Sequence, residues 1–251
     1  KKYKNNYLYQ IVSNSKNGID VDKLDYLARD AHSLGLNSGI DFFRFFHNFK
    51  VVNDEIIYSD KEIFNIYEMF HTRFKMHKQV YSHIVVKKID MMLSDILFLI
   101  YESKNIYFNF DKIFDNNLEI FCQLTDSFLE NLEWFCNNFR DNCDEKILKA
   151  NEIYQRIKKR NFYKLVDELS LTYEESIDKY LDKYNLKNYD LSNNYCYLLK
   201  SIGYSCNNIN PLRYVKFFNK YKILSSKEKG LLIGNILPRN FSEKHLLIFK
   251  K

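Results

Sequence analysis

Apolar residues recur every three or four positions along most of the chain, which is the spacing of helices that bury one face. Asp20 follows Asn17-Gly18-Ile19 and is a residue type that caps helices, so we expect a helix to begin there. The long apolar series that starts near Asp60 predicts an extended helical stretch with a bend. The expected helices cover residues 20–31, 41–48, 60–103, 118–135, 144–157, 162–169 and 173–186.

Two other parts of the chain have the character of strands. Residues 51–58 alternate poorly and are expected to form a short strand or hairpin. After about residue 190 the chain is rich in Tyr, Phe, Val and Ile, which predicts strands over 194–204, 213–224 and 246–250. The expected fold class is therefore mostly α, with a helical body followed by a small α+β lobe.

The composition narrows the class of protein. The 251 residues are 46% hydrophobic and 17% aromatic, enough for a sizeable core in one large domain or two small ones. Five cysteines without a CxxC spacing argue against a disulfide framework or a cysteine zinc site, and indicate a reducing compartment. The longest apolar run, residues 91–101, is too short to span a bilayer. We expect an intracellular protein, in the nucleus or the cytoplasm, with no membrane partner.

Positive charge points to an anionic partner. The net charge is +6, and it is most concentrated at Lys158-Lys159-Arg160 with Lys164 one turn further on. Phe162 and Tyr163 lie between them, so this cluster suits phosphate or single-stranded nucleic acid. An ordinary solvated helix end fits the same pattern.

Polar side chains line one face of the first expected helix. Asp22, Tyr26 and Asp30 are spaced four residues apart, and Lys23 and Arg29 adjoin them. A carboxylate can bind a metal, a lysine can bind phosphate, and a tyrosine can contact a sugar. The alternative is a solvated network of surface charges.

A second polar stripe has the same spacing. Arg73, His77 and Tyr81 share one helix face, where Arg offers paired donors for phosphate. A half-buried polar stripe is the alternative interpretation. His71, His77 and His83 recur every six residues, a rotation of about 600° on a helix, so they do not converge on a metal.

Three strings of residues carry a resemblance to a known family. They are NGIDVDKLDYLARD over 17–30, YEMFHTR over 67–73 with His77 and Tyr81-Ser82-His83, and RNFYK over 160–164. Together they resemble the HD-superfamily deoxynucleotide triphosphohydrolases whose animal members also carry a sterile-alpha-motif domain. Weaker similarities at 210–211, 215–218 and 237–238 extend the resemblance along nearly the whole chain.

The resemblance implies an activity and its residues. The implied reaction is hydrolysis of a deoxynucleoside triphosphate (dNTP) to the deoxynucleoside and inorganic triphosphate. Asp22 matches the last metal ligand of the family. Asp22 and His77 are the implied catalytic residues. The resemblance also implies a divalent metal (Mg, Mn, Fe or Zn) in the full-length enzyme. Lys23 and Arg73 match residues that hold the triphosphate. The implied substrate-binding positions are Lys23, Tyr26, Asp30, Arg73 and Tyr81.

The family is also regulated by nucleotides that bind between its subunits. The resemblance therefore implies a homo-oligomer with GTP or dGTP as activator. Ser59, Gln79 and Ile84 stand where animal members have basic residues, which removes phosphate contacts and leaves the activator open. The matching regulatory positions are Arg44, Lys61, His83, Arg160 and Lys164.

The same resemblance implies a division of the chain. Residues 1–110 match the C-terminal part of the HD domain, 111–190 a helical regulatory region and 191–251 the small β-containing lobe. No His-Asp pair occurs in the sequence, so we expect residues 1–251 to bind no metal and to be inactive alone. Two alternatives stay open: a catalytically silent module that binds nucleotide or single-stranded nucleic acid, and an HD hydrolase with another phosphorylated substrate.

Overall fold

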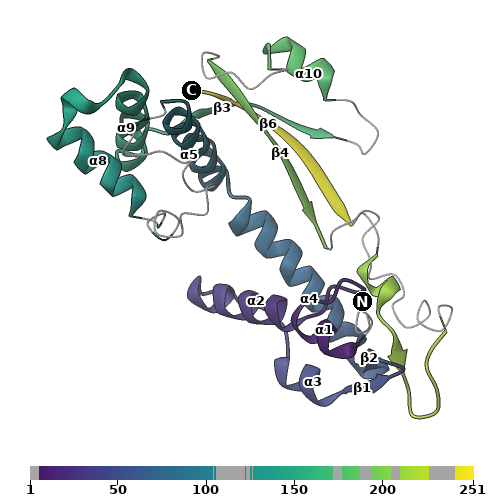
Figure 1. The fold of residues 1–251 in the computed structure, drawn as a ribbon. Coiled ribbons are helices and arrows are strands. Elements are labelled where there is room, and N and C mark those ends of the chain that lie inside the picture. The colour runs from purple at the N-terminus through teal and green to yellow at the C-terminus, as the bar shows by residue number, and fades with distance from the viewer. Residues whose placement is uncertain are drawn as a thin grey trace. The chain divides into compact units, whose positions relative to one another are not determined.

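Helices dominate the described part of the chain, which confirms the mostly helical expectation (Figure 1). The computed structural model describes residues 6–103, 105, 122, 125, 127–171, 177–186, 194–204, 210–225 and 241–251. Contacts divide the chain into two compact units, residues 1–82 with 201–244 and residues 83–200 with 245–251. The three-part division expected from the sequence stays a prediction.

The first unit contains four of the described helices. They are α1 (Tyr7–Val12), α2 (Val21–Ser33), α3 (Phe42–His47) and α4 (Ile63–Met76). Asp20 caps α2 as expected, because its side chain accepts a hydrogen bond of 3.1 Å from the amide of Lys23. The apolar face of α2 then buries Leu24, Leu27 and Ala31 in the core of this unit.

A hairpin packs beside these helices. Strands β1 (Phe49–Val52) and β2 (Glu55–Ser59) pair in antiparallel fashion, as the sequence predicted for this region. Asn53 and Asp54 form its two-residue turn with φ of 52° and 57°, the left-handed conformation that tight hairpin turns require. A short strand, β5 (Phe217–Phe218), pairs with β2 in parallel.

The expected strand over 213–224 is wrong for most of its length. Pro211–Tyr214 forms a 3₁₀ turn, because Asn210 accepts a hydrogen bond of 2.9 Å from the amide of Leu212 and Pro211 suits the first helical position. The chain pairs with β2 only through β5, and Phe218 forms an isolated bridge with Ile223. The apolar composition on which the strand was predicted did not indicate the turn that Asn210 and Pro211 begin.

The helical stretch expected over 60–103 is divided into several helical elements in the structure. A 3₁₀ turn over Asp60–Glu62 leads into α4, a π-helical turn covers His77–Tyr81, and α5 spans Ile84–Ser103. The division between the two units falls between Ser82 and His83. Short π-helical segments often accompany functional sites, and this one contains two of the predicted site residues.

The second unit is built around helices α5, α8 (Phe128–Asn138) and α9 (Glu145–Lys158). A 3₁₀ turn, Arg140–Asn142, joins the last two helices, and Asp144, where the expected helix begins, caps α9. Most of the residues between 118 and 127, where the sequence predicts the start of a helix, lie outside the described residues. The fully buried core of this unit includes Met92, Ile96, Ile100, Leu132, Ile147 and Ala150.

A three-stranded sheet contains β3 (Lys164–Leu171), β4 (Tyr195–Gly203) and β6 (Ser242–Lys250) in the order β3-β6-β4. The expected strands over 194–204 and 246–250 are confirmed. The helix expected over 162–169 is wrong, because β3 occupies that place and alternates between exposed and half-buried residues. Phe162, Leu165, Val166 and Leu169 fit a helical face by spacing, but the strand gains its partner from β6, far along the chain. Helix α10 (Asp178–Lys183) lies within the predicted 173–186, and residues 172–176 are outside the described part.

Within the described residues, no helix combines the length and the apolar character that crossing a membrane requires.

Replacing the cap of α9 tests this account of helix formation. The Asp144 side chain accepts a hydrogen bond of 2.8 Å from the amide of Ile147. Asp144→Ala should lower the free energy of unfolding by about 1 kcal/mol, measured by urea denaturation. Asp141→Ala, an exposed residue in the preceding turn, is the control and should change it by less than about 0.5 kcal/mol. Equal effects of the two substitutions would contradict the role of the cap.

Candidate functional site

The predicted metal and phosphate residues of α2 lie at its first turn. Asp22 is exposed there, one helical turn before Tyr26. The ammonium of Lys23 lies 2.8 Å from the carboxylate of Asp20, whose side chain is 2% exposed. Asp20 also accepts a hydrogen bond of 3.0 Å from the amide of Asn14. The ion pair fixes the direction of Lys23 and leaves two of its three N–H groups able to donate elsewhere.

Four of the predicted residues come together between α2 and the π-helical turn. The hydroxyl of Tyr81 donates a hydrogen bond of 2.6 Å to the carboxylate of Asp30. The ring of Tyr26 meets the ring of Tyr81 edge to face with centroids 6.2 Å apart, and His77 does so at 5.1 Å. Burial, followed by the bond to Asp30, raises the pKa of Tyr81 well above its usual range. The phenol therefore stays protonated at neutral pH and keeps its hydrogen bond to Asp30, and the group offers rings and a carboxylate to a ligand.

Arg73 makes a different contact. It lies one turn before His77 on α4, and its guanidinium donates a hydrogen bond of 2.6 Å to the carbonyl of Gly203. The neighbouring Tyr204 stacks on Phe74 with centroids 4.8 Å apart, and its hydroxyl lies 3.1 Å from Nδ1 of His71. These contacts hold the segment around Gly203 against α4 and leave other guanidinium N–H groups able to donate to an anion.

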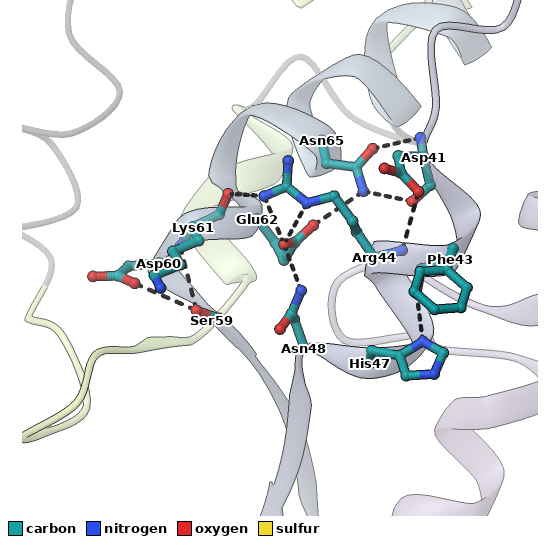
Figure 2. Close-up of polar contacts among 10 residues, drawn as sticks. All are labelled: Asp41, Phe43, Arg44, His47, Asn48, Ser59, Asp60, Lys61, Glu62 and Asn65. Atoms are coloured by element: carbon teal, nitrogen blue, oxygen red, sulfur yellow. Dashed lines mark hydrogen bonds and ion pairs between the residues drawn. The ribbon is translucent and has the colours of Figure 1, made fainter.

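Arg44, a predicted regulatory residue, is held by a buried carboxylate (Figure 2). Its Nε and one terminal nitrogen lie 3.2 Å and 3.0 Å from Oε1 of Glu62, a residue with no exposed surface. Asn48 donates to the same oxygen and Asn65 donates to the other. The guanidinium also donates to the carbonyl of Lys61, so the structure brings these two predicted residues together. Glu62 thus joins α3, the start of β1 and α4.

The other predicted regulatory residues lie in the second unit, where all three are exposed. Nδ1 of His83 accepts a hydrogen bond of 3.3 Å from the amide of Val85, at the start of α5. Arg160 follows α9, and Lys164 begins β3. Tyr163, which the sequence suggested for base stacking, is 2% exposed and is therefore not accessible to a base.

Sequence reasoning missed the acidic residues that orient the predicted cations. Asp20 was recognised as a helix cap but not as the partner of Lys23, although its place three residues earlier was a signal. Glu62 gave one signal, a carboxylate beside the apolar series that begins at Ile63. Their roles depend on side chains that meet only in the folded chain.

Comparison with known proteins gives this geometry a context. No protein-family model matches the chain. It is 31% identical to the deoxynucleoside triphosphate triphosphohydrolase SAMHD1 homolog of Dictyostelium discoideum over 97% of the chain. It is 32% identical to human deoxynucleoside triphosphate triphosphohydrolase SAMHD1 over 98%, and 36% identical to a putative HD domain-containing protein of Acanthamoeba polyphaga mimivirus over 85%.

This chain is a relative of the HD-type dNTP triphosphohydrolases. It covers 46% of the Dictyostelium protein, 42% of the human protein and 48% of the mimivirus protein, so it spans less than half of each. The comparisons therefore confirm the relationship that the three strings of residues indicated.

Asp22 alone does not form a metal site. Among the residues that the structure describes, no group of three or more His, Cys, Asp or Glu side chains is placed to bind a metal. A catalytic metal needs several ligands, so Asp22 would need partners from outside such a group. We derive no step of the reaction through a metal.

Removing the Glu62 carboxylate should destabilise the protein. Glu62→Ala removes the buried carboxylate that accepts hydrogen bonds from Arg44, Asn48 and Asn65, so the free energy of unfolding should fall by about 2–3 kcal/mol in chemical denaturation. Asp60→Ala, two residues earlier, removes a carboxylate that accepts a bond of 3.4 Å from Ser59 and should cost about 0.5 kcal/mol or less. If both variants lose the same stability, Glu62 is not the centre of this network.

Alkaline pH should destabilise the fold partly through Tyr204. Burial raises the pKa of Tyr204 to about 12, from the usual value near 10. The native state prefers the protonated phenol, so this contribution is complete below pH 10 and is lost as pH rises towards 12. Urea midpoints measured from pH 8 to 11 should fall less steeply for Tyr204→Phe than for the unchanged protein. Parallel curves would show that Tyr204 does not titrate in this way.

Proposed function

We propose that the protein containing this chain is a metal-dependent phosphohydrolase that converts a dNTP and water to the deoxynucleoside and inorganic triphosphate. The observation that supports it best is the contact between the two long matching strings. Asp30, at the end of the first, accepts the hydrogen bond from Tyr81, which follows the second. Residues 51 positions apart thus form one polar, aromatic surface of the kind that a nucleoside can occupy.

The cations suit the triphosphate. Lys23 and Arg73 each have one contact that fixes their direction, to Asp20 and to the carbonyl of Gly203. Both keep further donors for phosphate oxygens. In the proposed reaction, water attacks the α-phosphorus, the bond from this phosphorus to the 5′ oxygen of the nucleoside breaks, and that oxygen takes up a proton as the deoxynucleoside leaves. Negative charge grows on the triphosphate oxygens and on the departing oxygen in the transition state. Lys23 and Arg73 would stabilise that charge.

The remaining residues suit the sugar and the proton. Tyr26, Asp30 and Tyr81 offer a ring surface and hydrogen-bond partners to the deoxyribose. The imidazole of His77, next to the Tyr81 ring, can accept or donate a proton at the substrate. A divalent metal would supply an activated water, and Asp22 would be its ligand from this chain.

The regulatory residues fit an activating nucleotide. We propose that Arg44, Lys61, His83, Arg160 and Lys164 contribute to sites for GTP or dGTP in a homo-oligomer. The joining of Arg44 and Lys61 through a hydrogen bond supports a shared site for these two.

Triphosphate release tests the proposed reaction. The full-length protein should release triphosphate from dGTP, dATP, dCTP or dTTP with added divalent metal and GTP. Arg73→Ala should lower kcat/KM by about 100-fold or more, because a guanidinium that binds the triphosphate of the substrate is lost. Lys75→Ala, which removes an exposed cation from the same helix, is the matched control and should leave kcat/KM within about twofold.

Two outcomes would count against the proposal. If the full-length protein releases no triphosphate with GTP and dGTP present but binds these nucleotides, the silent binding module becomes the better account. If it hydrolyses another phosphorylated substrate faster than any dNTP, the substrate class is wrong. The polypeptide of residues 1–251 is expected to be inactive, and metal-dependent turnover by it would refute that expectation.

A further inference from the structure

Residues 158–164 form an exposed basic turn between α9 and β3. Lys159, Arg160 and Lys164 are exposed. Lys158 is paired with Glu133 at 2.7 Å, whereas no ion pair joins the other three cations to a carboxylate among the described residues. The turn therefore presents concentrated positive charge that is not neutralised by the described part of the chain, which suits a polyanion such as a nucleoside triphosphate.

The backbone of this turn is held in a conformation that side chains disfavour. Arg160 has φ of 57°, in the left-handed region where glycine is usual at the end of a helix. The amide of Asn161 donates to the carbonyl of Arg156 at 2.8 Å, and the amide of Arg160 donates to Ile157 at 3.0 Å. These two bonds form a Schellman motif that closes α9. An arginine is less stable than glycine in this conformation, so surrounding contacts must hold it.

A buried hydrogen bond supplies such a contact. The hydroxyl of Tyr163 donates to the carboxylate of Asp95 on α5 at 2.7 Å, and Tyr163 and Asp95 are 2% and 1% exposed. The ammonium of Lys251 lies 3.0 Å from the same carboxylate oxygen. The guanidinium of Arg156 lies over the Tyr163 ring, 5.2 Å from its centroid. Tyr163 is thus fixed from two sides, directly between Arg160 and Lys164 in the chain.

We propose that Asp95 and Tyr163 are positioning residues that hold Arg160 and Lys164 in place for the phosphates of an activating nucleotide. The inference rests on the regulatory function proposed above. Without the anchor, the strained turn would sample other conformations, and only part of the population would present both cations together. Apparent affinity falls in proportion to that fraction, although no ligand contact is removed.

Tyr163→Phe is the sharpest test, because it removes one oxygen atom and keeps the ring. In the full-length protein it should raise the dissociation constant for GTP, measured by calorimetry, about fivefold to tenfold. The kcat at saturating GTP should stay within about twofold of the unchanged protein. Amide exchange over 156–164 should become faster, because the Asn161 amide loses protection. Asp95→Asn should act in the same direction.

The matched control is Tyr184→Phe. Tyr184 also donates to a carboxylate, at 3.2 Å from Asp167, but it is not part of the basic turn. This variant should leave GTP affinity and exchange over 156–164 unchanged. A merely structural role for Tyr163 would lower stability and kcat without separating GTP affinity from turnover.

Arg160→Ala separates failure of this inference from failure of the regulatory function. If Arg160→Ala weakens GTP binding and Tyr163→Phe does not, the positioning role is overturned and the regulatory function stands. If Arg160→Ala leaves GTP binding and activation unchanged, the turn is not a regulatory site. In that case the regulatory function of the turn and the positioning role proposed for Tyr163 are overturned together, whatever the exchange over 156–164 shows.

Discussion

A carboxylate that is removed from water must receive hydrogen bonds or a counter-charge, since an unpaired buried charge costs several kcal/mol. Three buried carboxylates of the described chain meet this requirement in ways that orient other residues. Asp20 pairs with Lys23, and Glu62 binds Arg44. Asp95 accepts from Tyr163 and pairs with Lys251. Each acid connects parts of its own unit. Each also holds a cation, or the basic turn at residues 158–164, in a defined orientation.

Local patterns were sufficient for most of the helices. The cap at Asp20 and the helix that begins at about Asp144 agree with the sequence because they depend on neighbours in the chain. The strand β3 was mistaken for a helix because its partner β6 is distant in sequence, and its spacing of apolar residues suits both structures. The prediction of a strand over 213–224 was wrong because a turn capped by the Asn210 side chain forms there in spite of the apolar composition.

The sequence predicted which residues form the candidate site better than it predicted the contacts between them. The strings over 17–30 and 67–83 identified Tyr26, Asp30, His77 and Tyr81, which the fold brings together. The contact of Arg73 with Gly203 was not predictable, because it joins residues 130 positions apart. The acids that orient the cations were missed for the same physical reason. A sequence shows which groups can bind phosphate, and the tertiary structure decides which acids restrain them.

Both compact units are discontinuous in sequence, and this affects the order in which they can be completed during synthesis. The first unit needs residues 201–244 to join residues 1–82, and the second needs residues 245–251 to join 83–200. The ribosome therefore releases most of the second unit before either core is whole. Contacts of such long separation form late and slowly, so a nascent chain exposes apolar surface until β6 has been made. Chaperone dependence during translation is the expected consequence of this connectivity.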